Sequence, residues 1–200
     1  TAIDKLFFRF LTSYEQLAVY SVAVSAAAAA AVLQSVFSVV WAPTVYKWAS
    51  QGGGVDKIVD VMRYVLICVI ILFSLAGMFS WVVPLILPDG YENVQWILVS
   101  CMAFPLLYAL SEATVVGIGI SRRSSYAMLA AAIAFVVNIL GNGLLIPVFG
   151  ASGAAVSTCV SFFVFFILRT EFSAYLWCRF PRSCLYWYAF ILVSGAVCTT

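Results

Sequence analysis

The sequence contains no histidine and few charged residues. Ten Lys and Arg and eight Asp and Glu make 9% of its 200 residues, whereas ordinary soluble domains carry about 25%. Without histidine, the chain lacks the side chain used most often as a general base, a metal ligand or a pH switch near neutrality. The net charge of +2 is too small to indicate a nucleic-acid partner. The composition therefore excludes a typical soluble domain and the commonest catalytic chemistries.

The cysteines also lack the spacing of a metal site, because no C-x-x-C pair occurs. Most of them fall in apolar segments, where a free cysteine behaves as a small hydrophobic residue. They are Cys68, Cys101, Cys159, Cys178, Cys184 and Cys198. No nucleophile with an adjacent base, paired carboxylates or metal cluster can be drawn from the sequence. We therefore expect no enzyme activity, no metal and no cofactor.

Long apolar runs dominate the chain, which is 65% hydrophobic with a mean hydropathy of +1.11. Their lengths predict an all-α polytopic transmembrane helix bundle with about six spans. The predicted spans are 17–41, 64–87, 94–120, 126–148, 151–168 and 185–200. Residues 1–16 mix charges with Phe and Leu, which favours an interfacial segment on the periplasmic side. Because the chain starts without Met and stops inside an apolar run, we expect it to be part of a longer protein.

The distribution of Lys and Arg predicts the orientation of the bundle. Alternate connections place Lys47, Lys57, Arg63, Arg122, Arg123, Arg169, Arg179 and Arg182 on one side of the membrane. Only Lys5 and Arg9 fall on the other side. Cytoplasmic loops of membrane proteins carry the excess of positive charge, so the Arg122/Arg123 and Arg169–Arg182 side is predicted to be cytoplasmic.

One predicted hairpin occupies residues 138–158. A span is expected to break at Pro147, because proline cannot continue a helix interior. The segment from Gly150 to Gly153 is expected to turn tightly and to let the next helix approach closely. No Lys or Arg occurs between Ser125 and Leu168, so this hairpin can lie in hydrocarbon apart from its tip.

Polar side chains at mid-depth are the candidate site residues. Glu112 precedes Arg122 by about 15 Å of helical rise, near the middle of a hydrocarbon core about 30 Å thick. It is either a hydrogen-bonded packing residue or a cavity-lining group that responds to protons or ions. Gln34, Asn138 and Asn142 lie at similar depth. Hydrogen bonding between helices and a substrate cavity explain these amides equally well.

Three further positions have a simple interpretation. Arg122 and Arg123 are positive-inside anchors, although their guanidinium groups could also contact a diphosphate entering from the cytoplasm. Gly52–Gly54 is a flexible loop rather than a phosphate cradle, since no strand precedes it. Arg169 is assigned to a charged cytoplasmic link, so we expect no Lys or Arg deep within a span.

Several segments resemble a known family. Residues 17–25 (LAVYSVAVS), followed by Trp41-Ala-Pro43, resemble the second-lobe opening of bacterial polysaccharide flippases of the multidrug/oligosaccharidyl-lipid/polysaccharide superfamily. The hairpin at 138–158, with its Ile-Pro-x-Phe-Gly-Ala-x-Gly-Ala-Ala core, is similar to that family's most recognisable segment. Residues 108–112 (YALSE) and 117–123 (GIGISRR) fit the helix between them. The likeness covers residue 1 to about residue 168.

This resemblance implies a flippase of the bacterial inner membrane, in which two six-helix lobes alternate around a central cavity. The substrate would be an O-antigen or capsule oligosaccharide on undecaprenyl diphosphate, and the chain would supply most of the C-terminal lobe. Its partners would be that lipid-linked substrate, membrane lipids and the missing N-terminal lobe. A cation-coupled multidrug exporter of the same superfamily and a structural membrane subunit are the alternatives. The short predicted outer tips argue against a membrane glycan enzyme.

Overall fold

The computed structural model describes residues 14–51, 55–86, 94–178 and 182–200. These residues form helices and no strand, which confirms the all-α prediction. The elements are α2 (Tyr14–Ala26), α3 (Ala28–Ser50), α4 (Val55–Phe79), the 3-10 turn η1 (Ser80–Val82), α5 (Val83–Ile86), α6 (Val94–Thr114), α7 (Val116–Ile120), α8 (Ser124–Phe149), α9 (Ala151–Leu176) and α10 (Ser183–Thr199). Apart from the start of α2, the predicted interfacial segment lies outside the described residues. The glycine loop at 52–54 and the tip at 88–93 also lie outside them.

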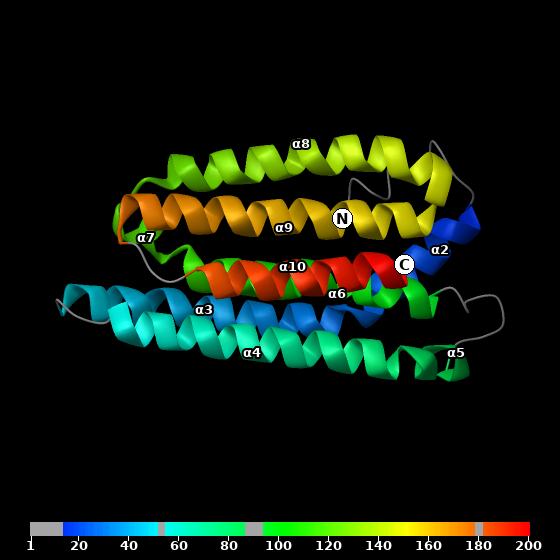
Figure 1. The fold of residues 1–200 in the computed structure, drawn as a ribbon, viewed down its shortest axis with the longest axis horizontal. Coiled ribbons are helices and arrows are strands. Elements are labelled where there is room, and N and C mark those ends of the chain that lie inside the picture. The colour runs from blue at the N-terminus through cyan, green and yellow to red at the C-terminus, as the bar shows by residue number, and fades with distance from the viewer. Residues whose placement is uncertain (1–13, 52–54, 87–93, 179–181) are drawn as a thin grey trace.

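The long helices run side by side along the long axis of the molecule (Figure 1). Helix α9 packs most extensively against α8 on one side and α6 on the other. Helix α6 also contacts α2, α3, α4 and α10. The centre of the bundle is therefore formed by α6 and α9, and the other helices surround them.

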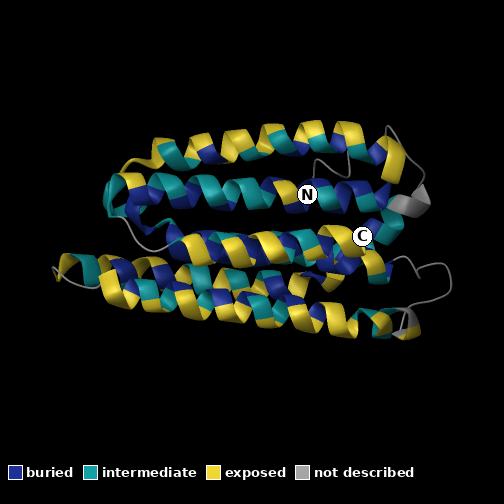
Figure 2. Cartoon of the chain, viewed as in Figure 1, coloured by how far each residue is buried: buried dark blue, intermediate teal, exposed yellow. Residues whose placement is uncertain are grey.

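The burial pattern is that of a protein surrounded by lipid (Figure 2). Large apolar side chains are exposed along the outer faces of the helices, such as Val39 on α3, Ile71 on α4 and Leu144 on α8. Polar side chains are instead buried at the centre: Ser100, Ser111, Thr114, Asn138, Asn142, Ser157, Thr158, Ser161, Arg169, Thr170 and Ser173. Lipid solvates apolar surfaces and leaves polar groups to find partners within the bundle.

Five helices are long and apolar enough to cross a membrane: α3, α4 with η1, α6, α8 and α9. Two shorter apolar helices, Leu17–Ala26 and Ser183–Thr199, accompany them. The chain is therefore a multi-pass helical membrane protein, and α10 corresponds to the last predicted span.

Several helices extend beyond their predicted ends. Helix α3 continues through Pro43 to Ser50, and α4 starts already at Val55. Helix α9 continues past the predicted end at residue 168 to Leu176. Hydropathy identifies only the apolar part of a helix, which lies in the hydrocarbon, whereas the backbone hydrogen bonds of the helix continue through polar residues at its ends.

The reversal between α8 and α9 occurs at Gly150, so the predicted break at Pro147 is wrong. Helix α8 includes Pro147 and ends at Phe149. Gly150 then takes φ 56° and ψ −126°, a conformation that only glycine adopts readily. Proline removes a single donor near the end of α8, whereas reversing the chain requires the unusual backbone angles of Gly150.

The two helices come very close just after this turn. A Cβ on Gly153 would lie 2.4 Å from the Leu145 carbonyl oxygen, so no larger residue fits without a shift of the backbone. Small residues permit such close approach between helices in lipid.

The described Lys and Arg residues gather at one end of the bundle. They lie at the end of α3, the first part of α4, the α7–α8 link, the last part of α9 and the residue before α10, all of which lie toward the left of Figure 1. These residues are Lys47, Lys57, Arg63, Arg122, Arg123, Arg169 and Arg182. We call this end the arginine end, and its cytoplasmic orientation stays a prediction of the positive-inside rule.

Candidate functional site

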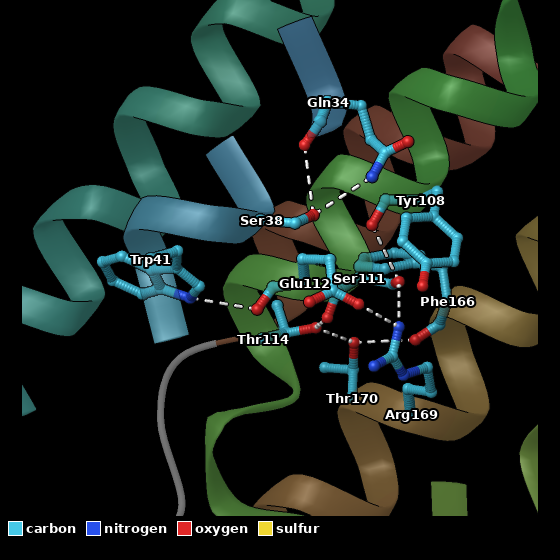
Figure 3. Close-up of polar contacts among 10 residues, drawn as sticks. All are labelled: Gln34, Ser38, Trp41, Tyr108, Ser111, Glu112, Thr114, Phe166, Arg169 and Thr170. Atoms are coloured by element: carbon cyan, nitrogen blue, oxygen red, sulfur yellow. Dashed lines mark hydrogen bonds and ion pairs between the residues drawn. The ribbon is translucent and has the colours of Figure 1, made fainter. Parts of the chain in front are cut away.

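A buried ion pair joins the two central helices near the arginine end. Arg169 Nη1 on α9 lies 2.8 Å from Glu112 Oε1 on α6, and it also donates to Ser111 Oγ at 2.9 Å (Figure 3). The two charged side chains are only 10% and 16% exposed. Close by, the hydroxyls of Thr114 and Thr170 hydrogen-bond at 2.7 Å. Charged pairs held in this way within membrane-spanning helices are uncommon and mark candidate functional sites.

Aromatic rings surround the guanidinium group of Arg169. Its central carbon lies 5.6 Å from the ring centroid of Tyr108 and 4.9 Å from that of Phe165. Ring faces attract cations, so these contacts replace part of the hydration that Arg169 loses on burial. The Nε atom is the exception, because it is buried without a hydrogen-bond partner among the described residues.

The ion pair lies beside an interruption in the third span, between the end of α6 and the start of α7. Trp41 Nε1 on α3 donates to the Glu112 carbonyl oxygen at 3.0 Å. The backbone N–H of Gly117 donates to Ser173 Oγ on α9 at 2.8 Å. Backbone groups within lipid need such partners wherever the helix is interrupted. Side chains from α3 and α9 therefore stabilise the break.

The absence of a side chain at position 117 makes this arrangement possible. A Cβ there would lie 2.4 Å from the Ser173 carbonyl oxygen, so α7 and α9 meet backbone to backbone at this point. The interruption and the ion pair are thus parts of one tightly packed junction between the two central helices.

A cavity of about 410 Å³ opens beside this junction, between α3, α6, α7, α8 and α9. Its walls include Trp41, Ala42, Val45, Tyr46, Glu112, Val115, Val116, Ile118, Gly119, Arg122, Ser124, Ala127 and Arg169. Most of these side chains are apolar, and three are charged. The cavity can therefore hold an amphiphilic group that has both an apolar part and a charged part.

Only some of the predicted site residues reach this cavity. Glu112 and Arg122 line it, whereas Arg123 is exposed and forms the N-cap of α8. Gln34 is half-buried on α3, and its Nε2 donates to Ser38 Oγ of the same helix at 3.0 Å. This hydrogen bond therefore lies within α3 and does not join Gln34 to a second helix.

Asn138 and Asn142 belong to the contact between α8 and α9. Asn138 Nδ2 lies 3.4 Å from Thr158 Oγ1 and 3.3 Å from Ser161 Oγ, and Asn142 Nδ2 donates to Asn138 Oδ1 at 3.3 Å. Both amides are buried. Ser161 and Arg169 are separated by about 12 Å of helical rise along α9. This polar contact and the ion pair are therefore two separate features.

Arg169 is the site residue that sequence reasoning missed. The predicted fifth span ends at residue 168 and leaves Arg169 in a charged link, whereas α9 continues to Leu176 and carries Arg169 as one of its buried residues. Two signals could have revealed it. Glu112 at mid-depth requires a partner, and residues 154–176 contain no proline or glycine that would end α9 near Leu168.

The fold and the site together define a polytopic helical membrane protein with a buried ion pair at an interrupted span. Comparisons with protein-family models, with curated proteins and with solved structures find no significant match to this chain. The resemblance to polysaccharide flippases therefore stays a prediction based on the order and spacing of its motifs.

Proposed function

We propose that the chain is part of a transporter that moves a lipid-linked oligosaccharide, carried on undecaprenyl diphosphate, across the bacterial inner membrane. The observation that carries the proposal is the Glu112–Arg169 ion pair at the interruption between α6 and α7. Charges within membrane spans are costly, and interrupted helices form the binding sites of many transporters. A purely structural bundle needs neither feature.

The arrangement of the pair favours a moving junction. Its two charges come from different helices, and Trp41 on α3 is bonded to the same residue, Glu112. A change in the α6–α9 contact would therefore alter the ion pair and the cavity together. This is the coupling that alternating access requires between a site and the helices around it. The resemblance supplies the substrate class and implies a further lobe on the other side of the cavity.

The test is complementation by the complete protein in a bacterial strain that lacks its polysaccharide flippase. Wild-type protein should restore surface polysaccharide. Glu112→Gln should lower the rate of restoration at least tenfold while the amount of protein in the membrane stays normal. Glu171→Gln is the matched control, because Glu171 pairs with Arg182 at 2.9 Å but is 42% exposed. It should keep wild-type activity.

The same strains separate the alternatives. If the wild-type protein raises resistance to cationic drugs and restores no polysaccharide, the multidrug exporter is correct and the lipid-linked substrate is wrong. If it does neither, a structural subunit is favoured. Full polysaccharide restoration by Glu112→Gln would contradict the role given to the ion pair.

A further inference from the structure

Two arginine side chains and a helix N-terminus line the cavity beside the ion pair. Arg122 and Arg169 both line it, and so does Ser124 in the first turn of α8. No side chain caps the N-terminus of α8, and its first turn holds no acidic residue. The free N–H groups and the partial positive charge of a helix N-terminus attract anions.

Arg169 gives independent support for a ligand. Its side chain is nine-tenths buried, yet Nε has no partner among the described residues. A buried donor without a partner is unfavourable. Nε is enclosed in the structure, so a ligand in the cavity would reach it through a shift of the Arg169 side chain, which lines the cavity. The apolar walls formed by Trp41, Val45 and Ile118 continue from these polar groups.

We propose that this cavity binds the phosphate headgroup of an anionic phospholipid from the leaflet at the arginine end. The phosphate oxygens would accept from Arg122 and from the first turn of α8, next to the Arg169 side chain in the cavity wall, while the glycerol and upper acyl chain would contact the apolar walls. Basic pockets between membrane helices bind anionic headgroups in this way. The site is a lipid site, and it does not depend on the chain being a transporter.

The carboxylate of Glu112 also lines the cavity and would repel an anion. Its Oε1 accepts from Arg169 Nη1, so the pair as a whole is close to neutral. Arg122 and the α8 N-terminus then leave the cavity with a positive balance. This positive balance favours a headgroup with a net negative charge over a zwitterionic headgroup, whose ammonium group would be repelled by Arg122.

The first experiment measures lipid binding to the purified chain in detergent by native mass spectrometry, with short-chain phosphatidylglycerol and phosphatidylethanolamine as probes. Phosphatidylglycerol should bind more tightly than phosphatidylethanolamine. Arg122→Gln should weaken phosphatidylglycerol binding about fivefold, the equivalent of about 1 kcal/mol for one arginine near a membrane surface. Arg123→Gln is the matched control, because Arg123 is also exposed but is not among the described residues that line the cavity. It should bind like the wild type.

A second pair of variants tests the cavity without changing any charge. Ala127→Leu would fill the cavity from α8 and should abolish the preference for phosphatidylglycerol. Ala131→Leu, one turn further along at an exposed position, should preserve it.

Three results would overturn the proposal. Equal binding of the two lipids would exclude a headgroup site. Equal weakening by Arg122→Gln and Arg123→Gln would indicate general attraction to the surface. Competition by inorganic phosphate as effective as that by phosphatidylglycerol would assign the cavity to a free anion rather than to a lipid. None of these readouts involves transport, so this proposal and the proposed function can fail separately.

Discussion

The energetic weight of the Glu112–Arg169 pair can be measured with a double-mutant cycle. The two side chains are 10% and 16% exposed and their charged atoms lie 2.8 Å apart, so the pair behaves as a buried one. Removing one partner of a buried pair costs about 3–5 kcal/mol, because the other charge stays buried alone. Arg169→Met should fall at the upper end of this range. Glu112→Gln should fall at the lower end, since an amide oxygen can still accept from Arg169.

The double variant removes both charges and should therefore cost less than Arg169→Met alone. We expect a coupling free energy of at least about 2 kcal/mol between the two positions. The assay is unfolding of the purified chain in mixed micelles with increasing sodium dodecyl sulfate, followed by circular dichroism. The measured quantity is the free energy of unfolding of the wild type, the two single variants and the double variant.

The half-exposed pair Glu171–Arg182 provides the control cycle, in a Tyr186→Phe background because Tyr186 also donates to Glu171 Oε1. Its atoms are 2.9 Å apart, but its side chains are 42% and 31% exposed. Solvent-exposed pairs contribute about 0–1 kcal/mol and weaken in salt. The coupling at Glu112–Arg169 should therefore be larger and should change little with salt. If the two cycles gave the same coupling, burial would not be what gives the central pair its strength.

Two other changes test helix packing, one at the site and one at the α8–α9 turn. Trp41→Phe removes the donor to the Glu112 carbonyl and should lower the free energy of unfolding by about 1–2 kcal/mol, measured in the same micelles. Trp187→Phe, at a position 68% exposed, is the control and should have little effect. An equal loss in both variants would show that the Trp41 hydrogen bond does not stabilise the break between α6 and α7. Gly153→Ala should cost about 1–3 kcal/mol through its clash with α8, whereas Gly143→Ala, whose Cβ would meet nothing within 4 Å, should be neutral or gain up to about 1 kcal/mol. Similar stability of the two alanine variants would show that α8 and α9 are not in close contact.

The class of the fold follows from the sequence alone. Lipid offers no hydrogen bonds to the backbone, so long apolar runs with scattered prolines must become helices whatever their neighbours are. The position of the hairpin was predictable for a different reason, which is that glycine readily adopts the backbone angles that the turn at Gly150 requires. The break expected at Pro147 shows the limit of a local rule. One missing donor near a helix end does not stop the helix.

The candidate site was only half predictable. Glu112 stands out in the sequence because a carboxylate within a span is rare. Its partner Arg169 does not stand out, because in the sequence it is one more cation next to a predicted helix end. Packing of α9 against α6 decided that this arginine faces inward, and it brought together residues that lie far apart in the chain.

Hydropathy therefore determined which segments enter the membrane, because that depends on each segment and the solvent around it. The tertiary structure decided which charges meet inside it. That choice depends on how neighbouring helices fit together, and small residues such as Gly117 control the fit through contacts that no single segment encodes.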